Sequence, residues 1–299
     1  MPASAPDFLN PEVAARLDSL SLRAKLVVEG FIAGLHRSPY HGYSVEFAEH
    51  RAYGPGDEIR HVDWKLFGKT DRYYIKRFEE ETNLKSYLLI DQSRSMTFSS
   101  GAGSKLAYAQ NLAAALAYLM LKQQDAVGLA LFDSELRRYL PPRAKPSHIK
   151  ALIGILSSIT PGPETRMSPM LHKLAESIAK RGLIILISDL LDDPDEVMMG
   201  LKHLRHKQHE VIVFHLLDPQ ELEFSFSTRT RFRDLESGDS LTTEPWHIRK
   251  DYRAAIDRFI SHYRSLCRKH KIDYQLLTTD QPLDLALTEY LLKRRHAGG

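Results

Sequence analysis

The sequence Lys85-Ser-Tyr-Leu-Leu-Ile-Asp91 decides the fold of this chain, together with a second apolar run, Gly182-Leu-Ile-Ile-Leu-Ile-Ser-Asp189. Short, continuous apolar runs are typical of strands that are buried on both faces, as in parallel sheets. Helical patterns alternate with these runs along the chain. We therefore predict an α/β fold in which helices cover both faces of a doubly wound, mostly parallel sheet. Both runs end in an aspartate, and such sheets bind ligands outside the carboxyl ends of their strands.

The two aspartates belong to a candidate metal site. The first begins the sequence Asp91-Gln-Ser93-Arg-Ser95, and the later positions Thr165 and Asp189 complete the set. Carboxylates and hydroxyls are hard oxygen ligands, which suit Mg²⁺. We predict Mg²⁺ at this site, with Mn²⁺ and Ca²⁺ as alternatives.

Two positions in this site have alternatives. Thr160 stands close to Thr165 in the sequence and is a second candidate for the threonine ligand. Asp192 follows Asp189 closely, and it either competes as a ligand or caps the next helix.

The pattern Asp91-x-Ser93-x-Ser95, with a later threonine and a later strand-end aspartate, resembles the metal-ion-dependent adhesion site of von Willebrand factor A domains. The resemblance implies that the two serines bind the metal directly, that Thr165 binds directly or through water, and that both aspartates act mostly through water. It also implies that the metal keeps one position for an acidic side chain of a partner protein. Where that family usually has Asp-Gly, this chain has Asp189-Leu190, which is less permissive of a positive φ.

A second stretch, Arg51-Ala-Tyr-Gly-Pro-Gly-Asp-Glu-Ile-Arg-His-Val-Asp-Trp64, resembles the signature of the domain of unknown function 58 family. Members are typically encoded beside MoxR-type AAA+ ATPases, so the resemblance implies such an ATPase as the partner. Alternating charges at short spacing are also typical of an internal ion-pair network. Two interpretations of this stretch therefore remain, a partner-binding surface or an internal ion-pair network. The residues concerned are Arg51, Asp57, Arg60, Asp63 and Trp64.

Composition limits the classes of function. The chain has 299 residues, 43% of them hydrophobic, and a formal net charge of +3. So small a charge argues against nucleic-acid binding. The single Cys267 fits a reducing compartment, the first residues do not form a secretory signal, and no apolar run is long enough to span a bilayer. We expect a cytoplasmic protein.

The pattern of elements predicts three parts: an N-terminal tail and helix at 1–35, a small β-containing lobe at 36–83 that carries the signature, and an α/β domain at 84–295. A β-hairpin insertion is predicted at about 220–247, around a Glu-Ser-Gly-Asp turn. Strands are predicted at 43–47, 73–77, 85–91, 126–132, 136–140, 183–189, 210–216 and 272–277, and helices at 11–35, 104–122, 147–158, 168–181, 194–207, 247–270 and 283–295.

Two classes of function remain. The first is a non-enzymatic adaptor that binds an acidic side chain of its partner through the metal, with a role in protein maturation or remodelling. The alternative is a metal-dependent hydrolase or phosphotransferase that uses the same carboxylates, with Glu164 or Asp192 as its base. Ser100-Gly-Ala-Gly-Ser-Lys105 looks like a phosphate-binding loop, but Leu106 follows where that motif needs Ser or Thr.

Overall fold

The structure is a computed structural model, which describes residues 20, 24, 50–52, 66–68, 73–76, 85–101, 103–162, 166–233, 240–284 and 286–287. The chain divides into two compact units. Residues 36–83 form the smaller one, and residues 1–35 with 84–299 form the larger one.

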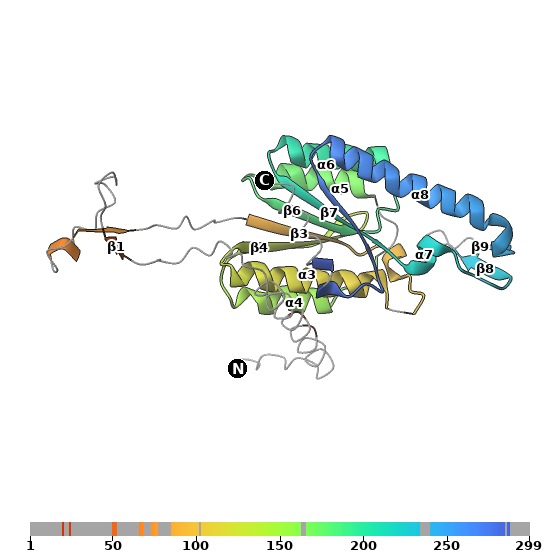
Figure 1. Ribbon diagram of the computed structural model, residues 1–299, viewed down its shortest axis with the longest axis horizontal. Coiled ribbons are helices and arrows are strands. Elements are labelled where there is room, and N and C mark those ends of the chain that lie inside the picture. Colours follow the sequence, from red (N-terminus) through yellow and green to blue (C-terminus); the bar gives the residue numbers. More distant parts are fainter. Residues whose placement is uncertain are drawn as a thin grey trace, which may run out of the picture. The chain divides into compact units, whose positions relative to one another are not determined.

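A six-stranded sheet forms the centre of the larger unit (Figure 1). Five of its strands run parallel, and only the edge strand β5 runs antiparallel to its neighbour β4. This arrangement confirms the predicted mostly parallel sheet. Across the sheet the strands are β10 (Asp273–Thr278), β7 (Glu210–Leu217), β6 (Leu183–Ser188), β3 (Lys85–Asp91), β4 (Ala126–Phe132) and β5 (Leu136–Arg143).

Helices cover both faces of the sheet, as predicted (Figure 1). On one face lie α3 (Lys105–Lys122) and α4 (His148–Ser157), and on the other lie α5 (Met167–Ser177), α6 (Pro194–His206) and α8 (Pro245–Lys269). Successive side chains of a strand point to opposite faces. Leu88 and Ile90 of β3 therefore pack with the first group of helices, whereas Tyr87 and Leu89 pack with the second. Two apolar cores result, one on each face.

The chain between β7 and α8 forms an insertion. It contains the short helix α7 (Pro219–Glu223), which the sequence patterns did not predict, and an antiparallel hairpin of β8 (Thr230–Arg233) and β9 (Ser240–Thr243). The Arg249 side chain of α8 donates to the carbonyl oxygens of Phe224 at 2.9 Å and Phe226 at 2.6 Å, and so holds the start of the insertion against α8. The predicted turn at 236–239 lies outside the described residues.

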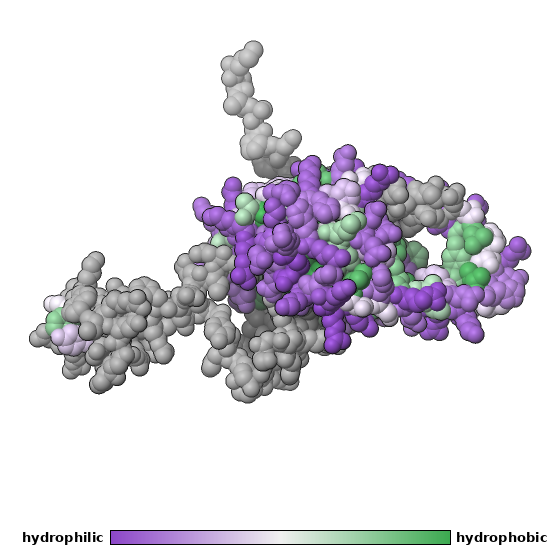
Figure 2. Space-filling model, turned by 90° about the horizontal axis from the view of Figure 1, so that it is seen from above, coloured by the Kyte–Doolittle hydropathy of each residue, from purple (hydrophilic) through white to green (hydrophobic). Residues whose placement is uncertain are grey.

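The surface of the insertion carries apolar side chains. Leu241 on β9 is 61% exposed, and Trp246, in the adjoining first turn of α8, is 46% exposed. Figure 2 shows hydrophobic residues at this end of the larger unit, whereas most of the surrounding surface in that view is hydrophilic.

The smaller unit contains a two-stranded antiparallel sheet of β1 (His50–Ala52) and β2 (Tyr74–Lys76), and Leu66–Gly68 are helical. The rings of Phe67 and Tyr73 stack at 4.4 Å. β2 falls within the predicted strand at 73–77, but the predicted strand at 43–47 lies outside the described residues. So do most of the predicted terminal helices: Leu20 and Ala24 of the first are helical, as are Leu283, Asp284, Ala286 and Leu287 of the last.

Within the part of the chain that the structure describes, no helix is both long enough and apolar enough to cross a membrane.

Candidate functional site

The predicted site lies where the strand order of the sheet reverses. From β3 the chain continues to β4 on one side, whereas β6, β7 and β10 follow one another on the other side. Asp91 ends β3, and Asp189 directly follows β6, the parallel neighbour of β3. Ile90 pairs with Ile187, so Asp91 lies level with Ser188 and beside Asp189. The site therefore occupies the position at which open α/β sheets bind ligands.

Asp91 is buried, and both of its carboxylate oxygens accept hydrogen bonds. Its Oδ1 accepts from the backbone N–H of Ser93 at 2.9 Å, and its Oδ2 accepts from the Ser188 hydroxyl at 2.7 Å. Burial and, to a smaller extent, the charge of Asp189 raise the pKa of Asp91 to about 7, although the hydrogen bonds from Ser188 and Ser93 act in the opposite direction. An ionised Asp91 is therefore a costly group that a cation would stabilise.

The two serines of the motif lie together beside Asp91. Their hydroxyl oxygens are 2.9 Å apart, and Ser93 is fully buried. The one-turn helix η2 (Ser95–Thr97) begins at the second serine, and the backbone N–H of Met96 donates to the carbonyl oxygen of Ser93 at 3.2 Å. This turn brings both hydroxyls to one place at the strand end.

Asp189 is bound by a lysine that the sequence analysis considered only for phosphate binding. Lys105 begins α3 and is fully buried. Its Nζ lies 2.8 Å from Oδ2 of Asp189 and 2.6 Å from Oε1 of Glu221 in α7. Burial of the ammonium lowers its pKa, but the charges of Asp189 and Glu221 outweigh burial and leave the pKa above its ordinary value. One oxygen of the second carboxylate is thus already paired with a cation of the protein itself.

Leu190 adopts a left-handed backbone conformation. Glycine, which von Willebrand factor A domains usually have at this position, would favour that conformation. The φ of Leu190 is +55° although it is not glycine, and its side chain is fully buried. Three hydrogen bonds fix the turn: the Leu190 N–H donates to the Ser188 hydroxyl at 2.9 Å, and its carbonyl oxygen accepts from the Asp192 N–H at 2.8 Å and the Tyr263 hydroxyl at 3.2 Å. A left-handed residue with a side chain costs roughly 1–2 kcal/mol, which these contacts and the burial of Leu190 offset.

Asp192 holds a different helix from the one predicted. Its Oδ2 accepts from the backbone N–H of Met167 at 2.8 Å, so it fixes the first residue of the preceding helix α5. The cap of the next helix, α6, is instead Asp193, whose side chain accepts from the N–H groups of Asp195 and Glu196. The capping alternative for Asp192 was therefore assigned to the wrong helix.

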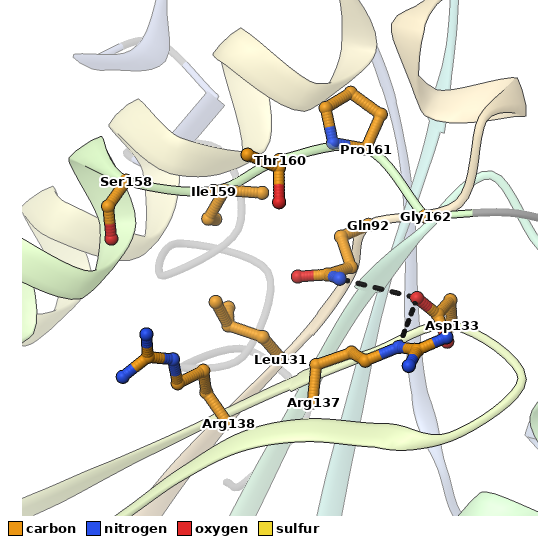
Figure 3. A pocket seen from close by; sticks show the side chains of 10 residues that line it. All are labelled: Gln92, Leu131, Asp133, Arg137, Arg138, Ser158, Ile159, Thr160, Pro161 and Gly162. Carbon is orange, nitrogen blue, oxygen red and sulfur yellow. Dashed lines mark hydrogen bonds and ion pairs between the residues drawn. The ribbon is translucent and has the colours of Figure 1, made fainter.

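The two threonine candidates are placed differently. Thr165 lies outside the described residues, which resume at Arg166. Thr160 lines a cavity of about 330 Å³ beside the site, together with Gln92, Arg137 and Arg138 (Figure 3).

The signature residues of the small unit are mostly outside the described part of the chain. Arg51 lies on β1, opposite Ile75 of β2. The remaining four, Asp57, Arg60, Asp63 and Trp64, are not among the described residues.

The oxygen ligands at the strand ends fit a small hard cation. Two hydroxyls and two carboxylates from two segments meet there, and Ser93 and Ser95 offer oxygens at a spacing that one ion can bridge. The residues described contain no cluster of three or more His, Cys, Asp or Glu side chains that would hold a metal by themselves. Besides the two carboxylates, the hydroxyl oxygens of Ser93 and Ser95 are available to an ion at this position.

Comparison with known proteins gives a family and several similar structures. The family described as "Protein of unknown function DUF58" matches residues 49–259. An uncharacterized protein of Mycobacterium bovis is 26% identical over 235 residues, which are 78% of this chain and 74% of the relative.

Two solved structures are similar to part of this chain. The conserved hypothetical protein BatB from Bacteroides thetaiotaomicron has 17% sequence identity and a TM-score of 0.48, with 71% of this chain and 99% of that chain covered. The VWA domain of SpRpn10 has 9% identity and a TM-score of 0.40, with 70% and 94% covered.

Proposed function

The chain belongs to the DUF58 family, as its signature predicted, and from that premise we propose that it is a protein-interaction module that binds an acidic side chain of a partner through a divalent metal. Ser93 and Ser95 would bind the metal directly, while Asp91 and Asp189 would act mostly through water. Thr165 would complete the set. Mg²⁺ suits these oxygen ligands best, with Mn²⁺ and Ca²⁺ as alternatives.

The observation that carries the proposal is the meeting of Asp91, Ser93 and Ser95 with Asp189 at the point where strand order reverses. The single ammonium of Lys105 lies near three carboxylates, those of Asp91, Asp189 and Glu221, so a bound cation would offset negative charge there. A metal supplies Lewis acidity there, and a carboxylate from a partner would complete its coordination. We further propose a MoxR-type AAA+ ATPase as the partner, a role in protein maturation or remodelling, and a cytoplasmic location.

The first test of this function compares Asp91→Ala with the wild-type chain. We expect Asp91→Ala to lose Mg²⁺ binding in calorimetric titration and to lose Mg²⁺-dependent capture of a purified MoxR-type ATPase from the same genome. Its melting temperature in EDTA at pH 8 should be unchanged or raised, because the substitution removes a buried charge that repels Asp189.

The control is Asp251→Ala, which removes an exposed carboxylate from α8. It should leave metal binding and capture unchanged. Equal capture by wild type and Asp91→Ala would contradict the proposal. So would a metal-dependent turnover of phosphoesters or peptides that Asp91→Ala abolishes, since this result would assign the site to an enzyme.

A further inference from the structure

A polar cavity adjoins the metal site on the side of the edge strand. It lies between β5 and the loop at 158–162 and has a volume of about 330 Å³. Gln92, which lines it, stands between Asp91 and Ser93 in the motif, and the backbone N–H of Gly162 donates to the Gln92 carbonyl oxygen at 2.7 Å. The motif and the wall of the cavity are therefore one connected structure.

Among the described residues of the wall, the one carboxylate is already neutralised. Asp133 is fully buried, and its two oxygens accept from Nε of Arg137 at 2.9 Å and 2.8 Å. Oδ2 also accepts from Nε2 of Gln92 at 3.3 Å, and Oδ1 accepts from the Glu135 N–H at 3.0 Å. These donors hold the pKa of Asp133 below its usual value although burial alone would raise it. Asp133 therefore contributes structure to the cavity and little free negative charge.

Arg138 gives the cavity wall a positive charge that is not paired with Asp133. It is exposed on β5, and its guanidinium makes no hydrogen bond or ion pair with any residue that the structure describes. Figure 3 shows Arg138 at one side of the cavity, with the Thr160 hydroxyl and the Gln92 amide pointing toward the space between them. A guanidinium and a hydroxyl can donate hydrogen bonds to a carboxylate, and the side-chain oxygen of Gln92 can accept one from a backbone N–H of a bound segment.

We propose that this cavity binds a second acidic side chain of the partner, next to the one that would coordinate the metal. The inference rests on the proposed function, because Gln92, which lines the cavity, stands between the metal-site residues Asp91 and Ser93, so that one extended segment would reach both sites. Arg138 is the specificity-determining residue, and Thr160 and Gln92 orient the bound segment. A partner segment with two acidic side chains would bind more tightly than a segment with one, since a single carboxylate can occupy only the metal site or the cavity.

The probe is a blocked hexapeptide of alternating Glu and Gly residues, titrated into the ¹⁵N-labelled full chain with Mg²⁺ and followed by NMR. An analogue with Gln in place of Glu serves as the neutral peptide. The variant is Arg138→Gln. Its matched control is Arg143→Gln, which removes the same charge from an exposed position on the same strand, opposite Val127 at the far end of β4.

We expect the Glu peptide to bind wild type and Arg143→Gln equally, and to bind Arg138→Gln roughly threefold to fivefold more weakly, as an exposed ion pair would allow. The neutral peptide should not distinguish Arg138→Gln from the wild type. Equal binding of the Glu peptide by Arg138→Gln and Arg143→Gln would overturn the proposal. So would tighter binding of inorganic phosphate at the same ionic strength, which would assign the cavity to a free anion.

The Asp91→Ala variant separates this inference from the proposed function. If Asp91→Ala removes the Mg²⁺-dependent part of binding while Arg138→Gln has no effect, the metal site stands and the cavity proposal is wrong. If Arg138→Gln weakens binding and Asp91→Ala does not, the cavity stands as an acidic-peptide site and the metal-dependent function is wrong.

Discussion

Asp91 and Lys105 are fully buried charged residues at the strand ends, and their electrostatics set the behaviour of the site. The Lys105 ammonium pairs with Asp189 and Glu221, whereas Asp91 accepts hydrogen bonds from the Ser93 N–H and the Ser188 hydroxyl. Burial makes a carboxylate costly to ionise. The ammonium therefore offsets negative charge at Asp189, while burial and the charge of Asp189 raise the pKa of Asp91.

Asp91 should make the stability of the metal-free protein depend on pH. Its pKa is raised to about 7 in the folded chain, above the ordinary value that it has when unfolded. Protonated Asp91 therefore stabilises the folded state. This contribution is fully present at low pH and is lost as the pH rises through the folded pKa of about 7. Between pH 5 and pH 8 the free energy of unfolding in EDTA should fall by roughly 2–3 kcal/mol through this group.

The measurement is urea unfolding of wild type and Asp91→Asn across that range. Burial also raises the pKa of Asp125, to about 6, and this group contributes equally to both proteins. The difference between them isolates Asp91. Parallel pH profiles for the two proteins would show that Asp91 is not the titrating group.

Lys105 should be essential to the stability of the larger unit. Lys105→Met leaves Asp189 and Glu221 without their cation, and breaking a buried ion pair from one side costs about 3–5 kcal/mol. Mg²⁺ should bind the variant more tightly than the wild type, because the second oxygen of Asp189 becomes available. Chemical unfolding and calorimetry measure the two effects. Lys122→Met, an exposed change at the end of the same helix, should stay within about 0.5 kcal/mol of wild type.

At the scale of elements, the loop after α4 depends on a glycine. A Cβ added at Gly162 would overlap Oδ2 of Asp133, the carboxylate that organises the end of β4. The loop can approach β4 this closely only without a side chain. Gly162 thereby fixes the position of the chain just before the segment that carries Thr165.

Gly162→Ala should destabilise the protein by roughly 1–3 kcal/mol, as overpacking does, and should weaken Mg²⁺ binding by moving the loop. Gly154→Ala is the matched control. Gly154 lies within α4 with no atom near its added Cβ, and alanine favours the helix by roughly 0.5–1 kcal/mol. Thermal unfolding should therefore shift in opposite directions for the two variants. If Gly162→Ala left the melting temperature unchanged, the loop would be able to move away from Asp133 without loss of stability.

At the scale of the whole molecule, the sheet of the larger unit brings together residues that are far apart in the sequence. β3 and β6 are adjacent although nearly a hundred residues separate Asp91 from Asp189. The helices between them cross over both faces, and the two strand ends lie where the strand order reverses, the position at which such sheets bind ligands. Lys105 reaches the same place because α3 begins at the carboxyl end of the sheet.

The sequence by itself determined the class of fold and the order of the central elements. Buried parallel strands are continuous apolar runs and amphipathic helices have a period of 3.6 residues, so β3, β6 and α6 could be predicted to within a few residues. The α7 helix was missed because five residues carry too little periodicity.

Only the tertiary structure decided which charges meet. The ion pairs of Lys105 with Asp189 and Glu221 join residues 84 and 116 positions apart, and no local pattern records such a contact. The Ser188 hydroxyl on Asp91, the helix that Asp192 caps, and the cavity formed by Gln92, Thr160 and Arg138 likewise depend on which strands are neighbours. Local sequence sets the conformation of each segment, whereas packing of the segments sets the distances between their side chains, and the chemistry of this site depends on those distances.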